Sequence, residues 1–268
     1  MSDTALRALA PPETDGTEMF AGPILAPVRL TDGVISALSE AILDGRLKPG
    51  EALPAEARLA ARFGVSKQVV REAMRQLAAL GVLQVGQGRA TRVVEALDAQ
   101  PLARFWRFAA GGTRAGLAEA VELRRMIEPQ VARLAAQHAT PEGLAQLRRI
   151  LDRMADAMGD IPRWITADLD FHDHLAALSG NRLVRLQVHG LRPVIEEVMR
   201  LFNAREPRGP ADWQATWDRH RLVADTIAAQ DPEATERAML AHFAAAETAI
   251  AELFPSRAAD PPERTTPG

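Results

Sequence analysis

The chain of 268 residues contains no cysteine, and aromatic residues make up only 4% of it. Without cysteine, disulfide bonds and thiolate metal sites are excluded, so any metal must be held by histidine and carboxylate side chains. Because aromatic residues are few and alanine, leucine and arginine dominate, the composition favours a mainly helical protein. The chain is long enough to form two modest domains, each with its own core.

The sequence also lacks long hydrophobic runs and a strong net charge. No run reaches the length that spans a membrane, and the start, MSDTALRALAPPETDG, has neither the basic segment nor the long apolar core of a signal peptide. We therefore expect a soluble cytoplasmic protein that does not enter a membrane. The formal net charge of −3 excludes neither a basic nor an acidic surface patch.

Local composition and the hydrophobic pattern divide the chain into five parts. Residues 1–24 and 255–268 are rich in proline and polar residues, which predicts a disordered N-terminal arm and a disordered tail. Residues 25–98 mix helical patterns with two short β-like runs, and residues 99–112 are expected to form a linker around one short helix. Residues 113–254 contain only helical patterns. The helices of this last block are expected near 114–138, 141–158, 162–179, 181–203, 213–230 and 232–253, with N-caps at Thr140, Asp160, Asp212 and Asp231.

The block 25–98 has the pattern of a winged helix-turn-helix. A helix that begins at a Thr31 cap is followed by a second helix at 55–63, and Ser66 caps a third helix after a Gly-Val turn. Two alternating runs, 82–85 and 90–94, then flank the sequence GQGR. The prediction is three helices followed by a β-hairpin wing.

The third helix decides the function of this block. Its expected core face consists of Val69, Ala73, Leu77 and Leu80. Its other side presents, within an arc of roughly 100°, the donors Lys67, Gln68, Arg71 and Arg75. A major groove admits a helix with such side chains, since Lys and Arg suit guanine and Gln suits adenine. From Arg46 to Arg92 nine basic residues stand against three acidic ones, which favours a DNA-binding surface over the alternative of an ordinary solvated face.

This block resembles the GntR family of bacterial transcription regulators, through LPAEARLAARFGVSKQVVREAMRQLAALGVL and the glycine-bearing wing. The resemblance implies that Lys67, Arg71 and Gly88 lie at DNA-contacting positions and that Ser66 binds phosphate, while Arg89 makes the wing basic. Many members of the FadR branch carry arginine directly after the glutamate of LPxE, whereas this chain has alanine there. Lys67 also replaces a more common arginine, and lysine lacks the bidentate fork of arginine. We therefore expect an operator sequence that differs from the usual one of the branch.

The heptapeptide DLDFHDH combines two patterns on one predicted helix of the second block. On a helical wheel, Asp168 and His172 lie at the centre of the apolar face. Asp170 and His174 lie on the polar face, and we interpret them as solvated.

His220 and His242 lie on the apolar faces of two later helices, so three helices direct imidazoles toward one core. A buried carboxylate such as Asp168 is costly unless it is paired or bound to a metal, and one divalent ion would satisfy all four groups. The alternative is a metal-free hydrogen-bond network between the aspartate and the histidines. Arg124 also points inward, either to form a salt bridge with Glu128 or to bind an anionic group through its planar fork.

The second block resembles the FCD domain, the all-helical effector domain of the FadR branch, through ELRRMIEP, DLDFH, DRHRLV and AMLAHF. The resemblance implies that a divalent metal, most often zinc with nickel or manganese as alternatives, is bound by Asp168, His172, His220 and His242. It also implies that Arg124 binds the effector and that the effector is a small carboxylate.

These predictions describe a mainly α protein with an N-terminal winged helix-turn-helix and an all-α helical-bundle effector domain. We expect a repressor and not an enzyme: a small carboxylate at the metal would shift the helical domains and release a homodimer from palindromic operator DNA. The main alternative is a metal-dependent enzyme that acts on a small carboxylate, since a metal with open positions activates water. A metal-free regulator of the acyl-CoA-binding kind and a purely structural metal are further alternatives.

Overall fold

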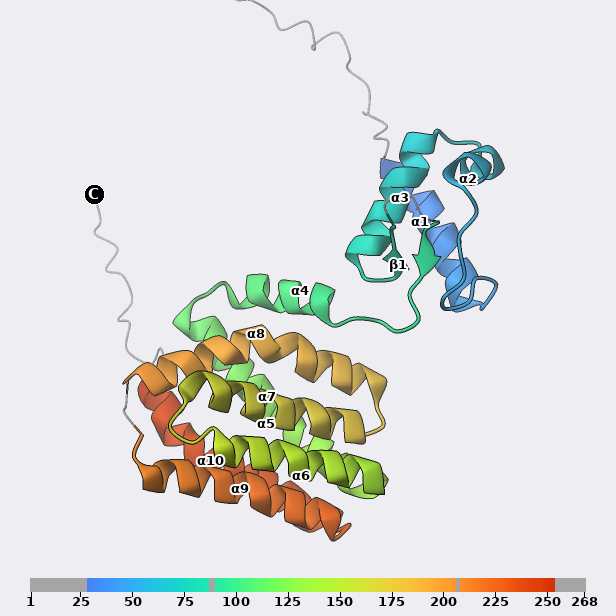
Figure 1. The fold of residues 1–268 in the computed structure, drawn as a ribbon. Coiled ribbons are helices and arrows are strands. Elements are labelled where there is room, and N and C mark those ends of the chain that lie inside the picture. The colour runs from blue at the N-terminus through green and yellow to red at the C-terminus, as the bar shows by residue number, and fades with distance from the viewer. Residues whose placement is uncertain (1–27, 87–89, 206–207, 254–268) are drawn as a thin grey trace, which may run out of the picture. The chain divides into compact units, whose positions relative to one another are not determined.

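The computed structural model describes residues 28–86, 90–205 and 208–253 (Figure 1). The chain divides into two compact units, residues 1–95 and residues 96–268. The predicted N-terminal arm and tail lie outside the described residues.

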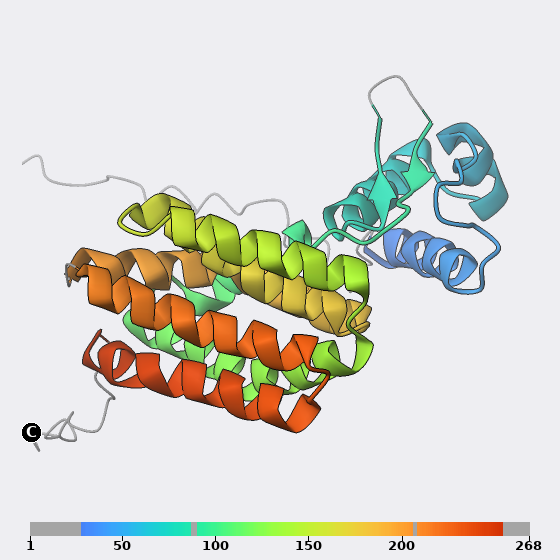
Figure 2. The ribbon, with the colours of Figure 1, turned by 60° about the horizontal axis from the view of Figure 1, so that its bottom comes forward.

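The first unit is a helix-turn-helix with a short hairpin (Figure 2). Its helices and strands are α1 (Val28–Leu43), α2 (Glu56–Phe63), α3 (Lys67–Ala79), β1 (Leu83–Gln84) and β2 (Arg92–Val93). The strands pair antiparallel, with Leu83 opposite Val93 and Gln84 opposite Arg92. The predicted winged helix-turn-helix is thereby confirmed.

The core of the first unit gathers around α3, whose buried residues are Val70, Ala73, Met74 and Leu77. Two expectations about this unit were wrong. Leu80 is 63% exposed, because α3 ends at Ala79 and Leu80 follows as its C-cap. Thr31 does not cap α1, because the helix already begins at Val28 and Thr31 is buried within it.

The second unit is entirely helical among its described residues. Its helices are α4 (Gln100–Ala110), α5 (Arg114–His138), α6 (Pro141–Asp156), α7 (Ile161–Leu178), α8 (Arg182–Arg205), α9 (Pro210–Ala228) and α10 (Pro232–Leu253). Within this unit α7 packs against α5, α6 and α8, while α10 packs against α5 and α9 (Figure 1). The predicted all-helical bundle is confirmed. None of the helices in the described ranges is long and apolar enough to cross a membrane.

Short polar residues begin most of these helices as predicted. The caps of α6, α7 and α10 are Thr140, Asp160 and Asp231, each of which accepts a hydrogen bond from the first turn of its helix. The cap expected at Asp212 was wrong. The helix α9 begins earlier, at Pro210, and the Asp212 carboxylate accepts a hydrogen bond from the backbone N–H of Gly209 at 2.8 Å.

The segment predicted as a linker contains α4, which packs on α8 of the second unit. A Cβ at Gly190 of α8 would lie 2.9 Å from the side chain of Leu102 on α4. A Cβ at Gly116 of α5 would lie only 2.0 Å from the carbonyl oxygen of Ala110 at the end of α4. These two glycines therefore permit the close approach of α4 to the bundle.

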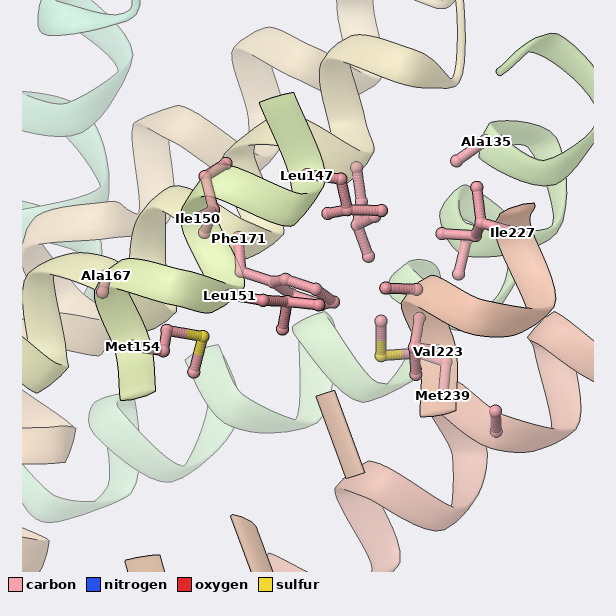
Figure 3. Packing of buried hydrophobic residues seen from close by; sticks show 14 of the residues in the cluster. Ala135, Leu147, Ile150, Leu151, Met154, Ala167, Phe171, Val223, Ile227 and Met239 are labelled. Carbon is pink, nitrogen blue, oxygen red and sulfur yellow. The ribbon is translucent and has the colours of Figure 1, made fainter. Parts of the chain in front are cut away.

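The main core of the bundle lies between α5, α6, α7, α9 and α10. Figure 3 shows this cluster, which includes the fully buried Phe171 of α7, Leu151 of α6 and Val223 of α9. The Phe171 ring also contacts the imidazole of His220, at 4.9 Å between ring centroids. The histidines named in the sequence analysis therefore lie directly beside the packed core.

Candidate metal centre and DNA-reading surface

The N-terminal half of α3 presents the side chains that were predicted to read DNA. Gly64, with φ of 66°, makes the turn between α2 and α3, and the Ser66 hydroxyl accepts a hydrogen bond from the backbone N–H of Val69 at 3.3 Å. The exposed donors are Lys67, Gln68, Arg71 and Arg75. Gly88 and Arg89 of the wing lie outside the described residues.

Arg71 is held by an ion pair that the sequence analysis did not anticipate. Its guanidinium donates to the Glu56 carboxylate of α2, at 2.7 Å between Nη2 and Oε2. The hydrogen bond from Arg71 lowers the pKa of Glu56 below its ordinary value. Arg75 is similarly paired with Glu72 at 2.7 Å. Both pairs are exposed, so DNA phosphates or base edges can compete for the two arginines.

The structure brings the four predicted metal ligands of the second unit together. His172 of α7, His220 of α9 and His242 of α10 place one ring nitrogen each within 4.8 Å of one another. Asp168, one turn before His172 on α7, places Oδ1 3.0 Å from Nε2 of His220 and Oδ2 3.8 Å from Nε2 of His172. Both carboxylate oxygens therefore face imidazole nitrogens.

The hydrogen bonds behind two of these rings determine which nitrogen faces the centre. His220 donates its Nδ1–H to the carbonyl oxygen of Thr216 at 2.8 Å, and His172 donates its Nδ1–H to the Glu128 carboxylate. Nε2 is then the nitrogen of each ring that faces Asp168. Such partners behind the ring are typical of histidines that bind metals.

Two buried ring nitrogens of this cluster have no hydrogen-bond partner among the described residues. They are Nε2 of His220 and Nδ1 of His242. Burial and the neighbouring histidines lower the pKa of His242 well below its ordinary value, so its ring is neutral. The lone pair on His220 Nε2 and the Asp168 carboxylate repel each other unless a proton or a metal ion lies between them. The donor set, three imidazoles and one carboxylate, therefore fits a divalent cation.

Glu128 is the residue of this site whose bridging role the sequence analysis missed. Its carboxylate contacts both Arg124 and His172, so it connects the ion pair to the histidine cluster. Burial raises the pKa of Glu128, but the charge of Arg124 and the hydrogen bonds from Arg124 and His172 outweigh that effect and lower the pKa to about 2. Arg124 thus makes the ion pair that the sequence analysis considered as its alternative role.

A cavity of about 160 Å³ opens beside this cluster. Its polar wall includes Arg124, Asp168, His172, Asn203, Arg208, Thr216, Arg219 and His242. Its apolar wall is formed by residues of α5, α7, α8 and α10, among them Val121, Trp164, Ile195, Val198, Met199, Phe202 and Phe243. The histidine cluster therefore borders a space that a small molecule can enter. Sequence reasoning missed Arg208 and Arg219, although Arg219 lies in the motif DRHRLV.

The polar face of α7 is less open to solvent than predicted. His174 is half-buried and donates a hydrogen bond from Nε2 to the carbonyl oxygen of Gly143 at 2.8 Å. Asp170 pairs with Arg153 at 2.8 Å and with Arg192 at 2.9 Å. The interpretation of this pair as simply solvated was wrong, because α6 and α8 pack on both sides of α7 and supply partners.

Known proteins resemble the chain over both units. Residues 30–93 match the gntR family of bacterial regulatory proteins, and residues 119–245 match the FCD domain. The HTH-type transcriptional regulator Mce2R of Mycobacterium tuberculosis is 31% identical over 84% of this chain and 93% of its own length. The galactonate operon transcriptional repressor of Escherichia coli is 28% identical over 83% of this chain and 97% of its own.

The solved structure of Streptococcus agalactiae GntR is also similar, with a TM-score of 0.60 and 28% identity over 81% of this chain and 99% of that one. These relatives are similar along nearly their whole length, so they cover the DNA-reading unit as well as the helical bundle. They support the prediction of a DNA-binding transcription regulator and not the alternative of a metal-dependent enzyme. The chain belongs to the GntR family of bacterial transcription regulators and carries an FCD domain in its second unit.

Proposed function

We propose that this regulator is a repressor that senses a small carboxylate at a divalent metal in its second unit. The ligands of the metal would be Asp168, His172, His220 and His242. The observation that carries this proposal is the convergence of three imidazoles and one carboxylate beside a cavity, with His220 Nε2 3.0 Å from Asp168 Oδ1. A shared divalent cation would be attracted both to the Asp168 carboxylate and to the imidazole nitrogens.

Zinc is the ion that we favour, with nickel or manganese as alternatives, because imidazole and carboxylate ligands suit these metals. When bound, the ion would supply positive charge and open coordination positions for an effector carboxylate. Glu128 would hold the His172 ring in the orientation that binding needs, and the carbonyl oxygen of Thr216 would do the same for His220. Arg124 lines the cavity beside the proposed metal ligands. We therefore retain it as an effector-binding residue, although Glu128 occupies some of the N–H donors of its guanidinium.

The DNA-reading part of the proposal concerns α3 and the wing. Its members are Ser66, Lys67, Gln68, Arg71, Arg75, Gly88 and Arg89. The exposed donors on α3 suit base edges in a major groove, and the N-terminus of the helix favours phosphate. We propose that a homodimer reads a palindromic operator, since a symmetric dimer matches two half-sites at a fixed separation.

Effector binding would be coupled to DNA release through the helices that form the cavity. The wall draws on five helices, so a ligand that binds one arrangement of them more tightly shifts the bundle toward that arrangement. A changed separation of the two recognition helices then weakens operator binding. The galactonate operon repressor, one of the relatives, is named for an operon of sugar-acid metabolism, which supports an acid as the effector.

An operator-release titration tests this proposal. The metal-loaded dimer is bound to fluorescent operator DNA and titrated with a panel of small carboxylates while anisotropy is followed. At least one acid should release the wild-type protein, and His220→Ala should remain bound at every concentration. His189→Ala is the matched control, because His189 is exposed on α8 and lies outside the cavity. Equal release of wild type and His220→Ala would contradict the proposal.

A further inference from the structure

Two further arginines line the same cavity. Arg208 and Arg219 both line it, and the ion pairs of the described ranges include no carboxylate partner for either guanidinium. Burial lowers the pKa of both groups, yet a guanidinium stays charged in proteins. Two partly buried positive charges without a carboxylate partner are unusual, because buried charges are normally paired.

The two guanidinium groups are held together by one threonine. Nη2 of Arg219 donates to the Thr216 hydroxyl oxygen at 2.9 Å, and Nη2 of Arg208 donates to the same oxygen. Arg208 also donates to the carbonyl oxygen of Asp212 at 2.9 Å, and its guanidinium stacks 4.1 Å from the ring centroid of Trp213. These contacts fix both groups before any ligand binds.

Most of the N–H donors of the two guanidinium groups have no partner among the residues that the structure describes. Nε of Arg219 is buried and has no hydrogen-bond partner in the part of the chain that is described. The hydrogen bonds that Arg208 makes to described residues use only its Nη2, so Nε and Nη1 have no partner within that part of the chain. A planar guanidinium with free donors suits a carboxylate or a phosphate, which it can bind through two parallel hydrogen bonds.

Asn203, which lines the cavity, has an amide oxygen without a hydrogen-bond partner among the described residues. The residue is 5% exposed, and its Nδ2 donates to the carbonyl oxygen of Met199 at 2.7 Å. If the amide were turned over, Oδ1 of Asn203 would face the carbonyl oxygen of Met199, and the two would repel each other. The hydrogen bond from Nδ2 therefore fixes the orientation of the amide and leaves Oδ1 as the group without a partner. Oδ1 is buried without a hydrogen-bond partner among the described residues, and Asn203 lines the cavity. A hydroxyl group on a ligand would satisfy it.

We propose that Arg208 and Arg219 form an anion subsite, so that the effector is an acid with two anionic groups. One group would bind at the histidine cluster and the other at the arginine pair, while Asn203 accepts a hydrogen bond from a hydroxyl between them. The proposal rests on the sensing function proposed above and specifies its ligand. Three arginines line the cavity, whereas only two carboxylates, those of Asp168 and Glu128, lie in it or are paired with its lining. The net charge of these five groups is therefore positive and favours an anion even without a metal.

The rest of the cavity wall is largely apolar, and this limits how many polar groups the ligand can carry between its two anionic groups. Val198, Met199 and Phe202 of α8 cannot satisfy several hydroxyl groups. A short carbon chain with one hydroxyl group fits this wall better than a fully hydroxylated sugar acid. The class is therefore a hydroxy acid that carries a second carboxylate or a phosphate.

Isothermal titration calorimetry with matched acids tests the subsite on the metal-loaded full chain. The probes are malate, 3-phosphoglycerate and 2-hydroxybutyrate, of which the last has a single charged group. Malate or 3-phosphoglycerate should bind at least about tenfold more tightly than 2-hydroxybutyrate, and whichever binds better identifies carboxylate or phosphate as the second group. In the double variant Arg208→Gln with Arg219→Gln this preference should disappear, whereas Arg237→Gln, an exposed residue of α10 outside the cavity, should keep it.

The subsite is overturned if the wild type lacks the tenfold preference, or if the double variant retains it. Metal content and operator affinity are measured on the same preparations. A protein without metal, or one that does not bind operator, contradicts the proposed function. A metal-loaded, operator-binding protein without a preference for the acids with two anionic groups contradicts the anion subsite alone.

Discussion

Replacing Glu128 with glutamine should destabilise the second unit by about 3–5 kcal/mol, because it leaves the buried charge of Arg124 without its partner. The side chains of Arg124 and Glu128 are only 9% and 3% exposed, so water screens this pair little. An exposed ion pair would contribute only about 0.2–1 kcal/mol, so the measured loss of stability distinguishes a buried ion pair from an exposed one. Glu128→Gln should also lower metal affinity by about tenfold to a hundredfold, since Glu128 orients His172.

The measurement is urea unfolding followed by tryptophan fluorescence, with a chelator present so that metal binding does not contribute. All four tryptophans lie between residues 106 and 217, so the fluorescence reports on the second unit alone. The double variant Arg124→Met with Glu128→Gln removes both charges and should recover most of the lost stability. A loss below about 1 kcal/mol for Glu128→Gln, or no recovery in the double variant, would refute the reasoning.

Four further predictions concern other parts of the molecule. Arg71→Ala should abolish the preference for operator over scrambled DNA in anisotropy titrations, since Arg71 is the central exposed donor of α3. Glu56→Gln should strengthen binding to scrambled DNA, because it removes the negative charge that holds Arg71 at 2.7 Å; unchanged affinity would argue against competition between Glu56 and DNA. Gly116→Ala should destabilise the second unit by about 1–3 kcal/mol in urea unfolding, because its Cβ would lie 2.0 Å from the carbonyl oxygen of Ala110; a neutral effect would show that α4 is not docked there. His174→Ala should leave metal content unchanged in elemental analysis, because its ring donates to Gly143 away from the cluster, and metal loss would contradict that placement.

Much of the fold could be predicted because its signals are local in the sequence. The pairs Thr140-Pro141 and Asp231-Pro232 mark helix starts through a capping oxygen and a proline that needs no hydrogen bond, and α6 and α10 begin there. The start of α9 could not be placed in this way. Asp212 has the residue type of a cap, but it accepts its hydrogen bond from Gly209 behind it, and sequence alone does not distinguish these two roles.

The candidate site likewise has features that the sequence predicts and features that it does not. Helical periodicity places Asp168 and His172 on the buried face of α7, since it depends only on spacing along one helix. The contact of Glu128 with His172 joins residues of two helices, and it depends on how α5 packs against α7. The convergence of Arg208 and Arg219 on Thr216 likewise depends on how the chain enters α9. Such contacts depend on how the helices pack, and the periodicity of a single helix does not predict that packing.

Elemental analysis of the purified full chain, set beside His220→Ala and the control His189→Ala, tests the central claim most directly. We predict about one divalent ion per chain in the wild type and in His189→Ala, and almost none in His220→Ala, because His220 supplies a buried nitrogen that faces the Asp168 carboxylate. Equal metal content in all three proteins, or a wild type that binds no divalent ion when zinc, nickel and manganese are supplied, would contradict the claim that this cavity is a metal-centred sensor.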